Sequence, residues 1–298
     1  MSDKINAPER TDAQPRIAIL VDSCCDVPST YLQSHPFYVV PLTINYHDTS
    51  YLDGVEITPA EVYARFEEEI PSTSTPTPAH AHEVFERIAA DGFTHVVCIT
   101  ISSGLSATFQ VLEDTGAEFA HLKVEMVDTL NIGIGSGMTA MYAADLLDQG
   151  ASFEEIVRGA RGVVPRTRIF FVPDTLEYLY KGGRIGKAVY SLGTMLNLRP
   201  VITCSEEGKY VVCGKARGRK KSVAKAIELA QECITPGKRY RFAVAQGMAE
   251  EEARKILADA PAYFPDAQQI VDAKELSPVL VVHTGPGLIG FVLQTLDE

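Results

Sequence analysis

Short runs of β-branched and other apolar residues alternate along the chain with amphipathic stretches. Strands are predicted over residues 16–22, 95–101, 123–128, 168–174, 200–204, 209–213, 241–246 and 279–283. Continuous apolar runs of this length are typical of strands buried on both faces, as in a mostly parallel sheet covered by helices. A further extended run over 37–46 contains Pro41, which favours a sheet edge because proline donates no ladder hydrogen bond. The pattern therefore predicts an α/β fold.

Several amphipathic stretches begin with helix start signals. Thr58 precedes a proline and is followed three residues later by Glu61, and Ser152 and Glu155 repeat this spacing. In each pair the hydroxyl and the carboxylate can satisfy backbone N–H groups of the first helical turn, which is the capping box. Thr77-Pro78 predicts another helix start because proline is favoured at the first helical position. Helices are therefore expected between the predicted strands.

The length of 298 residues is sufficient for two ordinary domains, each with its own core. We expect an N-terminal α/β domain over 16–164, with a mostly parallel sheet flanked by helices, and a smaller C-terminal α/β domain over 165–298. Residues 1–15 are polar and are predicted to form a flexible tail. That segment lacks the apolar core of a signal peptide, and no apolar run approaches membrane-span length, so a cytoplasmic protein without an integral membrane segment is expected.

The charge balance argues against nucleic acid as a partner. The chain has 27 Lys and Arg against 39 Asp and Glu, a formal net charge of −12, whereas a phosphate-backbone binder must neutralise many phosphates. The six cysteines contain no C-x-x-C pair and are too few for a disulfide scaffold in a chain of this length. They are predicted to be reduced thiols, with packing roles favoured over reactive ones.

Two hydroxyl-rich segments precede predicted helices. The segment CITISSGLSATFQ (98–110) places three serines and a glycine where a strand ends and a helix begins, and PSTSTPTP (71–78) is stiffened by its prolines. Hydroxyl groups and free helix N–H groups converging on one point suit a carboxylate or a phosphate. Ordinary helix capping is the alternative, and it is favoured for either segment alone.

Two glycine motifs follow predicted elements. GPGLIG (285–290) matches the dinucleotide fingerprint, but a Rossmann site needs a following helix and a second strand, and only eight residues remain. We expect a tight turn between two strands there. In DTLEYLYKGGRIGK (174–187), two glycines lie between Lys181 and Arg184, so the backbone can approach a ligand closely between two cations. A helix C-terminus with solvated charges is an equally good interpretation.

A basic cluster lies at a predicted helix start. Arg219, Lys220 and Lys221 fall in the expected first turn, where cations oppose the helix macrodipole by roughly 0.3–1 kcal/mol each. A solvated face is the usual explanation of such a run. Three unfavourable placements in an acidic protein also indicate a surface that meets an anionic partner.

Taken together, these stretches resemble the DegV family, the bacterial fatty-acid-binding proteins that include the FakB subunits of fatty acid kinase. The resemblance extends from about Arg16 to Leu296. The matching pieces, in family order and spacing, are VDSCCDVP, TSTPTP, SSGLSATFQ, DTLEYLYKGGRI, LNLRPVI, KARGRKK and HTGPGLIG. The resemblance implies two α/β domains with a long acyl chain, such as hexadecanoate, buried between them and its carboxylate held by hydroxyls of the first domain.

The resemblance also implies which residues surround the carboxylate. The threonine of the family's T-S-x-P motif is Thr73, and the serine after leucine in S-S-x-L-S is Ser106. The histidine of H-T-G-P-G is His283 and the arginine of K-G-G-R is Arg184, both expected as neighbours of the head group. Two departures occur near the site. Cys24 replaces a threonine, and Ala107 replaces a glycine and adds a methyl beside the proposed carboxylate.

These expectations describe a binding protein rather than an enzyme, with no metal or other cofactor. The family implies that, in organisms with a fatty acid kinase, the protein presents the bound carboxylate to that enzyme for phosphorylation. The alternative is an enzyme that acts on a small phosphorylated or acyl substrate at the same hydroxyl cluster.

Overall fold

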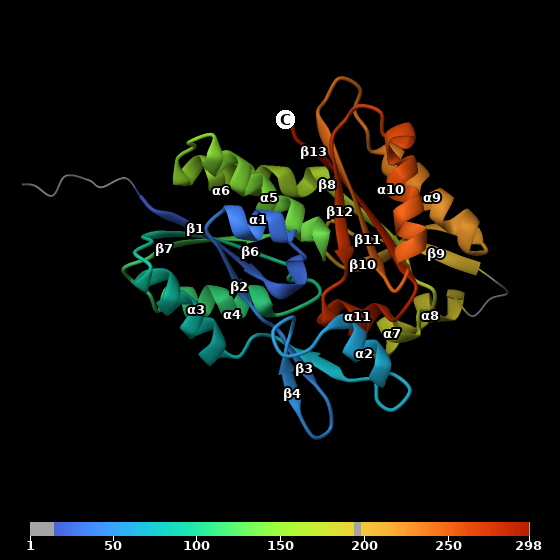
Figure 1. Cartoon of the computed structure of the whole chain (residues 1–298), viewed down its shortest axis with the longest axis horizontal. Helices are drawn as coiled ribbons and strands as arrows, with labels where there is room; N and C mark the ends of the chain where they lie inside the picture. Colours follow the sequence, from blue (N-terminus) through green and yellow to red (C-terminus); the bar gives the residue numbers. More distant parts are fainter. Residues whose placement is uncertain (1–14, 194–197, 298) are drawn as a thin grey trace, which may run out of the picture.

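The computed structural model describes residues 15–193 and 198–297, so the tail predicted for 1–15 lies, apart from Pro15, outside the described residues. Figure 1 shows a four-stranded sheet of the first half, in blue and green, beside a six-stranded sheet of the second half, in yellow to red. A small three-stranded sheet protrudes below their junction. The predicted α/β class, with an N-terminal parallel sheet flanked by helices and a second α/β region, is confirmed.

The sheet of the first half is entirely parallel and has the order β2-β1-β6-β7. Its strands are β1 (Ile17–Asp22), β2 (Phe37–Val40), β6 (His95–Thr100) and β7 (Lys123–Asp128). The helices around it are α1 (Ser29–Ser34), α3 (Pro78–Ala90), α4 (Thr108–Ala117), α5 (Ile134–Asp148) and α6 (Phe153–Val163). β2 is an edge strand that ends just before Pro41, as predicted.

Alternation along the strands divides the apolar side chains between two cores. On β1, Ala18 and Leu20 face the core under α3 and α4, whereas Ile17, Ile19 and Val21 face the opposite side. Successive strand residues point to opposite faces, so a run that is apolar at every position can fill both cores at once. This double burial explains why the strand carries no polar residue before Asp22.

The small sheet has the order β4-β3-β5 and is antiparallel. It contains β3 (Thr43–Asn45), β4 (Ser50–Leu52) and β5 (Ser72–Ser74), and it is joined by α2 (Pro59–Arg65). The extended run predicted over 37–46 is therefore two strands in different sheets, because the chain leaves the parallel ladder at Pro41. Both predicted capping boxes, Thr58 with Glu61 and Ser152 with Glu155, are confirmed.

The sheet of the second half has the order β10-β9-β8-β13-β11-β12. Its strands are β8 (Thr167–Val172), β9 (Leu198–Cys204), β10 (Tyr210–Arg217), β11 (Tyr240–Gly247), β12 (Ala267–Glu275) and β13 (Leu288–Thr295). All neighbours pair antiparallel except β11 and β12. The other elements of this half are α7 (Glu177–Lys181), α8 (Lys187–Gly193), α9 (Arg219–Glu232), α10 (Glu250–Tyr263) and α11 (Pro278–Thr284). Two 3-10 turns, η1 (Ser23–Cys25) and η2 (Val164–Arg166), complete the described chain.

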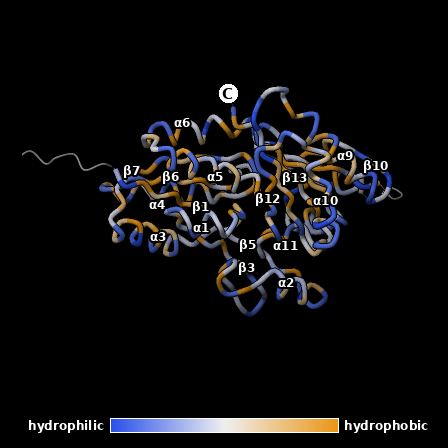
Figure 2. Tube along the Cα trace, turned by 45° about the horizontal axis from the view of Figure 1, so that its top comes forward, coloured by the Kyte–Doolittle hydropathy of each residue, from blue (hydrophilic) through white to orange (hydrophobic). Residues whose placement is uncertain are grey.

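The two halves share one core. Phe170 and Val172 of β8 pack under α9 and α10, whereas Ile169 and Phe171 belong to the same buried cluster as Ile19 of β1. Figure 2 shows the corresponding hydrophobic stretches of both halves converging at the middle of the molecule. Any site that lies between the halves is therefore built into this shared core.

The strand predicted over 279–283 is wrong, because these residues form helix α11. Every residue of α11 is buried, so its apolar run has no polar face, and such a run cannot be assigned to helix or strand by periodicity alone. Ser277 and Pro278 mark the start of the helix. The tight turn predicted at GPGLIG accordingly connects a helix to β13 rather than two strands.

Candidate ligand-binding site

The four predicted head-group residues line one cavity of about 370 Å³, which we call the head-group cavity. Thr73 and Ser106 come from the first half of the chain, and Arg184 and His283 come from the second. The cavity lies beyond the carboxyl ends of β1 and β6, the neighbouring strands between which the strand order reverses. Open parallel sheets place ligands at this switch point because the loops diverge there.

The serines of the segment 102–106 have different partners. Ser102 is fully buried and donates its hydroxyl to the carbonyl of Gly208 at 2.8 Å, which ties the segment to the turn between β9 and β10. Ser106 lines the cavity, and its Oγ accepts a hydrogen bond from the Thr108 backbone N–H at 3.3 Å. Ser106 therefore contributes to the start of α4 and remains positioned to meet a ligand.

Thr73 and His283 form a short polar contact between two side chains that line the cavity. Thr73 lies in β5, and its Oγ1 is 2.7 Å from His283 Nε2 on α11. His283 is 7% exposed, and its Nδ1 atom is buried without a hydrogen-bond partner among the described residues. Burial, reinforced by the positive charge of Arg184, lowers the pKa of His283 to about 3. The imidazole is therefore neutral at physiological pH.

Arg184 supplies the positive charge at the cavity. It follows the glycine pair that ends α7, and its Nη1 donates to the carbonyl of Gly182 at 2.6 Å. Gly182 is required because an added Cβ would lie 2.2 Å from His283 Nδ1. Within 15–193 and 198–297, Arg184 forms no ion pair, whereas its neighbour Lys181 pairs with Glu177 at 2.6 Å. The helix end predicted for this motif is confirmed. The close approach at Gly182 is to the His283 side chain, and a close approach of the backbone to a ligand stays a prediction.

A second, apolar cavity of about 30 Å³ adjoins the first. Ile132, Tyr210 and Leu280 line both cavities, so the polar and apolar spaces meet at these side chains. Residues lining the apolar cavity alone include Ile134, Ile169, Phe171, Ala245, Leu276 and Leu288. The site therefore has a polar end and an apolar end, both between the two halves.

The two departures from the family pattern, Cys24 and Ala107, both line the head-group cavity. Sequence reasoning missed one lining residue of both cavities. Tyr210 was not singled out, although its ring contacts Phe171 edge-on at 5.2 Å between centroids and forms part of both cavities. Its only signal is a tyrosine at the second position of the strand predicted over 209–213.

Buried carboxylates surround the turn after β1. Asp22 accepts hydrogen bonds from the backbone N–H groups of Cys24 at 2.9 Å and Ile101 at 2.7 Å. Burial raises the pKa of Asp22 to about 7, that of Asp26 to about 8 and that of Asp53 to about 6. These groups therefore change charge within or near the physiological pH range.

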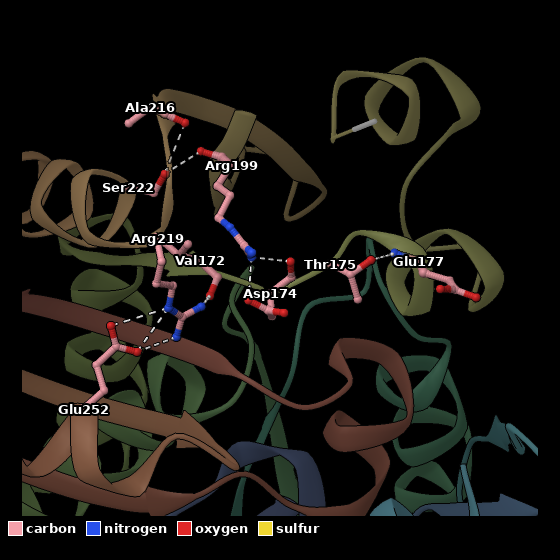
Figure 3. A network of polar contacts seen from close by, with 9 residues as sticks. All are labelled: Val172, Asp174, Thr175, Glu177, Arg199, Ala216, Arg219, Ser222 and Glu252. Atoms are coloured by element: carbon pink, nitrogen blue, oxygen red, sulfur yellow. Dashed lines mark hydrogen bonds and ion pairs between the residues drawn. The ribbon is translucent and has the colours of Figure 1, made fainter. Parts of the chain in front are cut away.

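The basic cluster lies away from both cavities, at the first turn of α9, as predicted. Arg219 points into the molecule, where Nη2 is 2.7 Å from Glu252 Oε2 and Nη1 donates to the carbonyl of Val172 at 3.2 Å. Figure 3 shows this guanidinium between α10 and the end of β8. Lys220 and Lys221 are exposed and form no ion pair with a described residue. Arg219 is thus a structural contact, and the lysines are the exposed part of the cluster.

No group of three or more described His, Cys, Asp and Glu residues could hold a metal ion. No described helix is long and apolar enough to cross a membrane.

Comparison with known proteins gives consistent matches over nearly the whole chain. The sequence model of a family described as "Uncharacterised protein, DegV family" matches residues 16–296. A DegV domain-containing protein of Clostridium perfringens is 36% identical over 279 residues, which are 94% of this chain and 98% of that protein. Another from Clostridium acetobutylicum is 35% identical over 93% of this chain and 98% of the relative.

Solved structures share the fold. A DegV family protein from Thermus thermophilus, described by its fatty acid binding, superposes with a TM-score of 0.87 at 34% identity, covering 94% of this chain and 100% of that one. A stearic-acid-binding protein from Eubacterium ventriosum gives a TM-score of 0.85 at 26% identity over 94% and 98% of the two chains. DegV of Bacillus subtilis, described as a fatty acid binding protein, gives 0.85 at 26% identity over 95% and 100%.

Proposed function

The chain belongs to the DegV family, and we propose that it binds a long-chain fatty acid with the carboxylate in the head-group cavity and the acyl chain in the apolar cavity. The observation that carries this proposal is the meeting of a polar and an apolar cavity at Ile132, Tyr210 and Leu280. A molecule with one charged end and a long apolar body matches that arrangement. Fatty acid binding by the related proteins of known structure supports the same class of ligand.

The polar groups of the head-group cavity suit a carboxylate. Thr73 and Ser106 can each donate an O–H, and Arg184 supplies a cation without an ion-pair partner in the described chain. For Thr73 to donate to the ligand, its Oγ1 must accept from His283, which requires the proton of the neutral imidazole on Nε2. Binding of an anion therefore favours that tautomer of His283.

The acyl chain must widen the apolar cavity. Its volume of about 30 Å³ is close to the share of one water molecule in the liquid. Side chains such as Tyr210 and Leu280 must therefore move when a chain enters. Each buried CH₂ contributes about 0.8 kcal/mol, so a long chain can offset the cost of that rearrangement and a short one cannot.

The geometry favours binding over acyl transfer. A hydroxyl 2.7 Å from an imidazole resembles a nucleophile with its base. His283, however, has a pKa of about 3 because of its burial, and no described group orients its Nδ1 atom. An imidazole with so low a pKa removes a hydroxyl proton poorly at neutral pH. Thr73 is therefore assigned to hydrogen bonding rather than to nucleophilic attack.

We further propose that the bound carboxylate is presented to a fatty acid kinase in the cytoplasm. The exposed Lys220 and Lys221 offer a local positive surface on a protein whose formal net charge is −12. An acidic patch on the partner would be attracted to this surface during encounter. The six cysteines are all free, which suits a reducing compartment.

Calorimetric titration with saturated acids from octanoate to octadecanoate tests the ligand class. We expect the affinity to rise with each added CH₂ until the apolar cavity is filled, and a fatty alcohol of equal length to bind more weakly than the acid. Equal affinity for short and long acids would rule out the apolar cavity as the acyl site.

A further inference from the structure

Helix α11 is held at two points about one turn apart, by Asp53 after β4 and by Thr73 of β5. The backbone N–H of Val279 donates to Asp53 Oδ1 at 3.0 Å, and His283 Nε2 lies 2.7 Å from Thr73 Oγ1. Val279 and His283 are four residues apart, so they occupy the same face of the helix about one turn apart. Asp53 directly follows β4 and Thr73 lies in β5, so the same small sheet provides both contacts.

Asp53 is surrounded by hydrogen-bond donors. Its Oδ2 accepts the hydroxyl of Ser23 at 2.5 Å, and the Cys24 thiol lies 3.9 Å from the same oxygen. Asp53 is 2% exposed and does not itself line the head-group cavity, whereas Cys24 and Val279 do. The carboxylate therefore lies behind the cavity wall and joins the turn after β1 to the first turn of α11.

We propose that Asp53 is a positioning residue for the carboxylate site, which fixes α11 along its axis so that His283 meets Thr73. This inference rests on the proposed function. A shift of α11 toward or away from Asp53 would move His283 by a similar distance, because a single helical turn is stiff. Thr73 would then lose the N–H donor that orients its hydroxyl, so its own proton would no longer be held toward the ligand. Asp53 thus acts on the head group through His283, without touching the ligand.

A merely structural role makes a different forecast. If Asp53 only stabilises the junction of the two halves, its loss should weaken the binding of any ligand between them. The matched control is Asp145→Asn, because Asp145 on α5 pairs with Arg241 on β11 and so joins the halves away from the head-group cavity. Asp53→Asn is the conservative variant, since its amide oxygen can still accept from Val279.

The experiment measures the affinities of hexadecanoate and hexadecanol for the parent, Asp53→Ala, Asp53→Asn, Asp145→Asn, His283→Ala and the double variant Asp53→Ala/His283→Ala. We expect Asp53→Ala to weaken the binding of hexadecanoate about tenfold, which corresponds to the loss of one hydrogen bond to a charged group. The binding of hexadecanol should weaken less than about twofold. Asp53→Asn should keep most of the parent's affinity for hexadecanoate. Asp145→Asn should leave the ratio of the affinities for hexadecanoate and hexadecanol unchanged. In the His283→Ala background, Asp53→Ala should cost less than about twofold, because coupled residues are not additive.

An equal loss for acid and alcohol, or an undiminished tenfold loss in the His283→Ala background, would overturn the positioning role. The ¹⁵N resonances of the His283 ring give a test that needs no ligand. Their chemical shifts should change in Asp53→Ala and return to the parent values in Asp53→Asn. Unchanged chemical shifts in Asp53→Ala would also overturn the positioning role. Failure of the parent to bind hexadecanoate would instead reject the proposed function, while the ring resonances still decide the placement of His283.

Discussion

Thr73 and Ser106 are single hydroxyls from separate elements that face the same cavity. A neutral donor to a charged acceptor contributes roughly 1.5–3 kcal/mol, and 1.4 kcal/mol corresponds to a factor of ten in affinity. Thr73→Ala or Ser106→Ala should therefore each weaken fatty acid binding about ten- to a hundredfold, measured by calorimetry. The double variant should depart from additivity because both hydroxyls share one acceptor.

Helix capping by Ser106 makes the opposite forecast, and its contact with the Thr108 N–H gives that alternative a structural basis. In that case Ser106→Ala lowers the free energy of unfolding by about 1 kcal/mol and leaves the preference for acid over alcohol untouched. Measuring thermal unfolding and both ligand affinities on the same variants separates the two roles. An unchanged acid preference would remove Thr73 and Ser106 from the site.

Asp26 makes a pH dependence testable at a single residue. Burial raises its pKa from 3.8 to about 8 in the folded protein, so folding favours the protonated form. Its contribution to stability is therefore present below about pH 4 and is lost as the pH rises through about 8. Asp26→Asn removes the charge and keeps an oxygen for the Ser277 N–H, which Asp26 Oδ1 now accepts at 3.1 Å.

We expect Asp26→Asn to raise the free energy of unfolding by at least about 1 kcal/mol more at about pH 8 than at about pH 5. This magnitude follows because one pKa unit corresponds to about 1.4 kcal/mol. Urea unfolding at the two pH values measures this difference. Asp48→Asn, at an exposed side chain, is the control and should show no such difference. A pH-independent effect of Asp26→Asn would show that the carboxyl is not buried in its neutral form.

At the scale of elements, helix α11 shows where sequence reasoning reached its limit. Its apolar run over 279–283 fits a buried strand and a buried helix equally well, and only the Ser277-Pro278 start signal favours the helix. The parallel strands β1, β6 and β7 were predictable because each is a short run rich in apolar and β-branched residues. The polar strand β12, which pairs with β11 at a sheet edge, has no comparable signal.

The site itself could be predicted only in part. The hydroxyl segment before α4 followed from strand-to-helix reasoning, whereas Thr73 and His283 are 210 positions apart and no local pattern relates them. The resemblance to a known family supplied that pair and Arg184. Asp53 and Tyr210 went unnoticed, since their roles depend on packing between segments that meet only in the folded chain.

The start of α9 carries a prediction about the partner surface. Changing both Lys220 and Lys221 to glutamate should leave fatty acid affinity unchanged and weaken kinase-dependent acyl-phosphate formation. The effect should be stronger at low salt, because high salt screens exposed charges. Arg219→Glu is unsuitable for this purpose, since it would place two carboxylates together at Glu252 and destabilise the fold. Equal acyl-phosphate formation by the double variant and the parent would show that the two lysines belong to an ordinary solvated surface without a partner role.

At the scale of the whole molecule, the proposed ligand site lies within the core that both halves share. Ile19 of the first sheet and Phe171 of the second belong to one buried cluster, and the apolar cavity lies within it. A ligand there contacts both halves and binds only the folded protein. It should therefore raise the free energy of unfolding with ligand concentration, by about 2.7 kcal/mol at one hundred times Kd.

Native mass spectrometry of protein purified without added lipid tests fatty acid binding most directly. We predict a mass increment equal to one long-chain fatty acid per chain, lost on delipidation and restored by hexadecanoate, because each CH₂ buried in the widened apolar cavity contributes about 0.8 kcal/mol to binding. Extraction and analysis of the released lipid would identify its length and saturation. Protein that carries no lipid, takes up no long-chain acid after incubation, and turns over an ester or a phosphate without any kinase would contradict the binding role and support an enzyme at the same hydroxyl cluster.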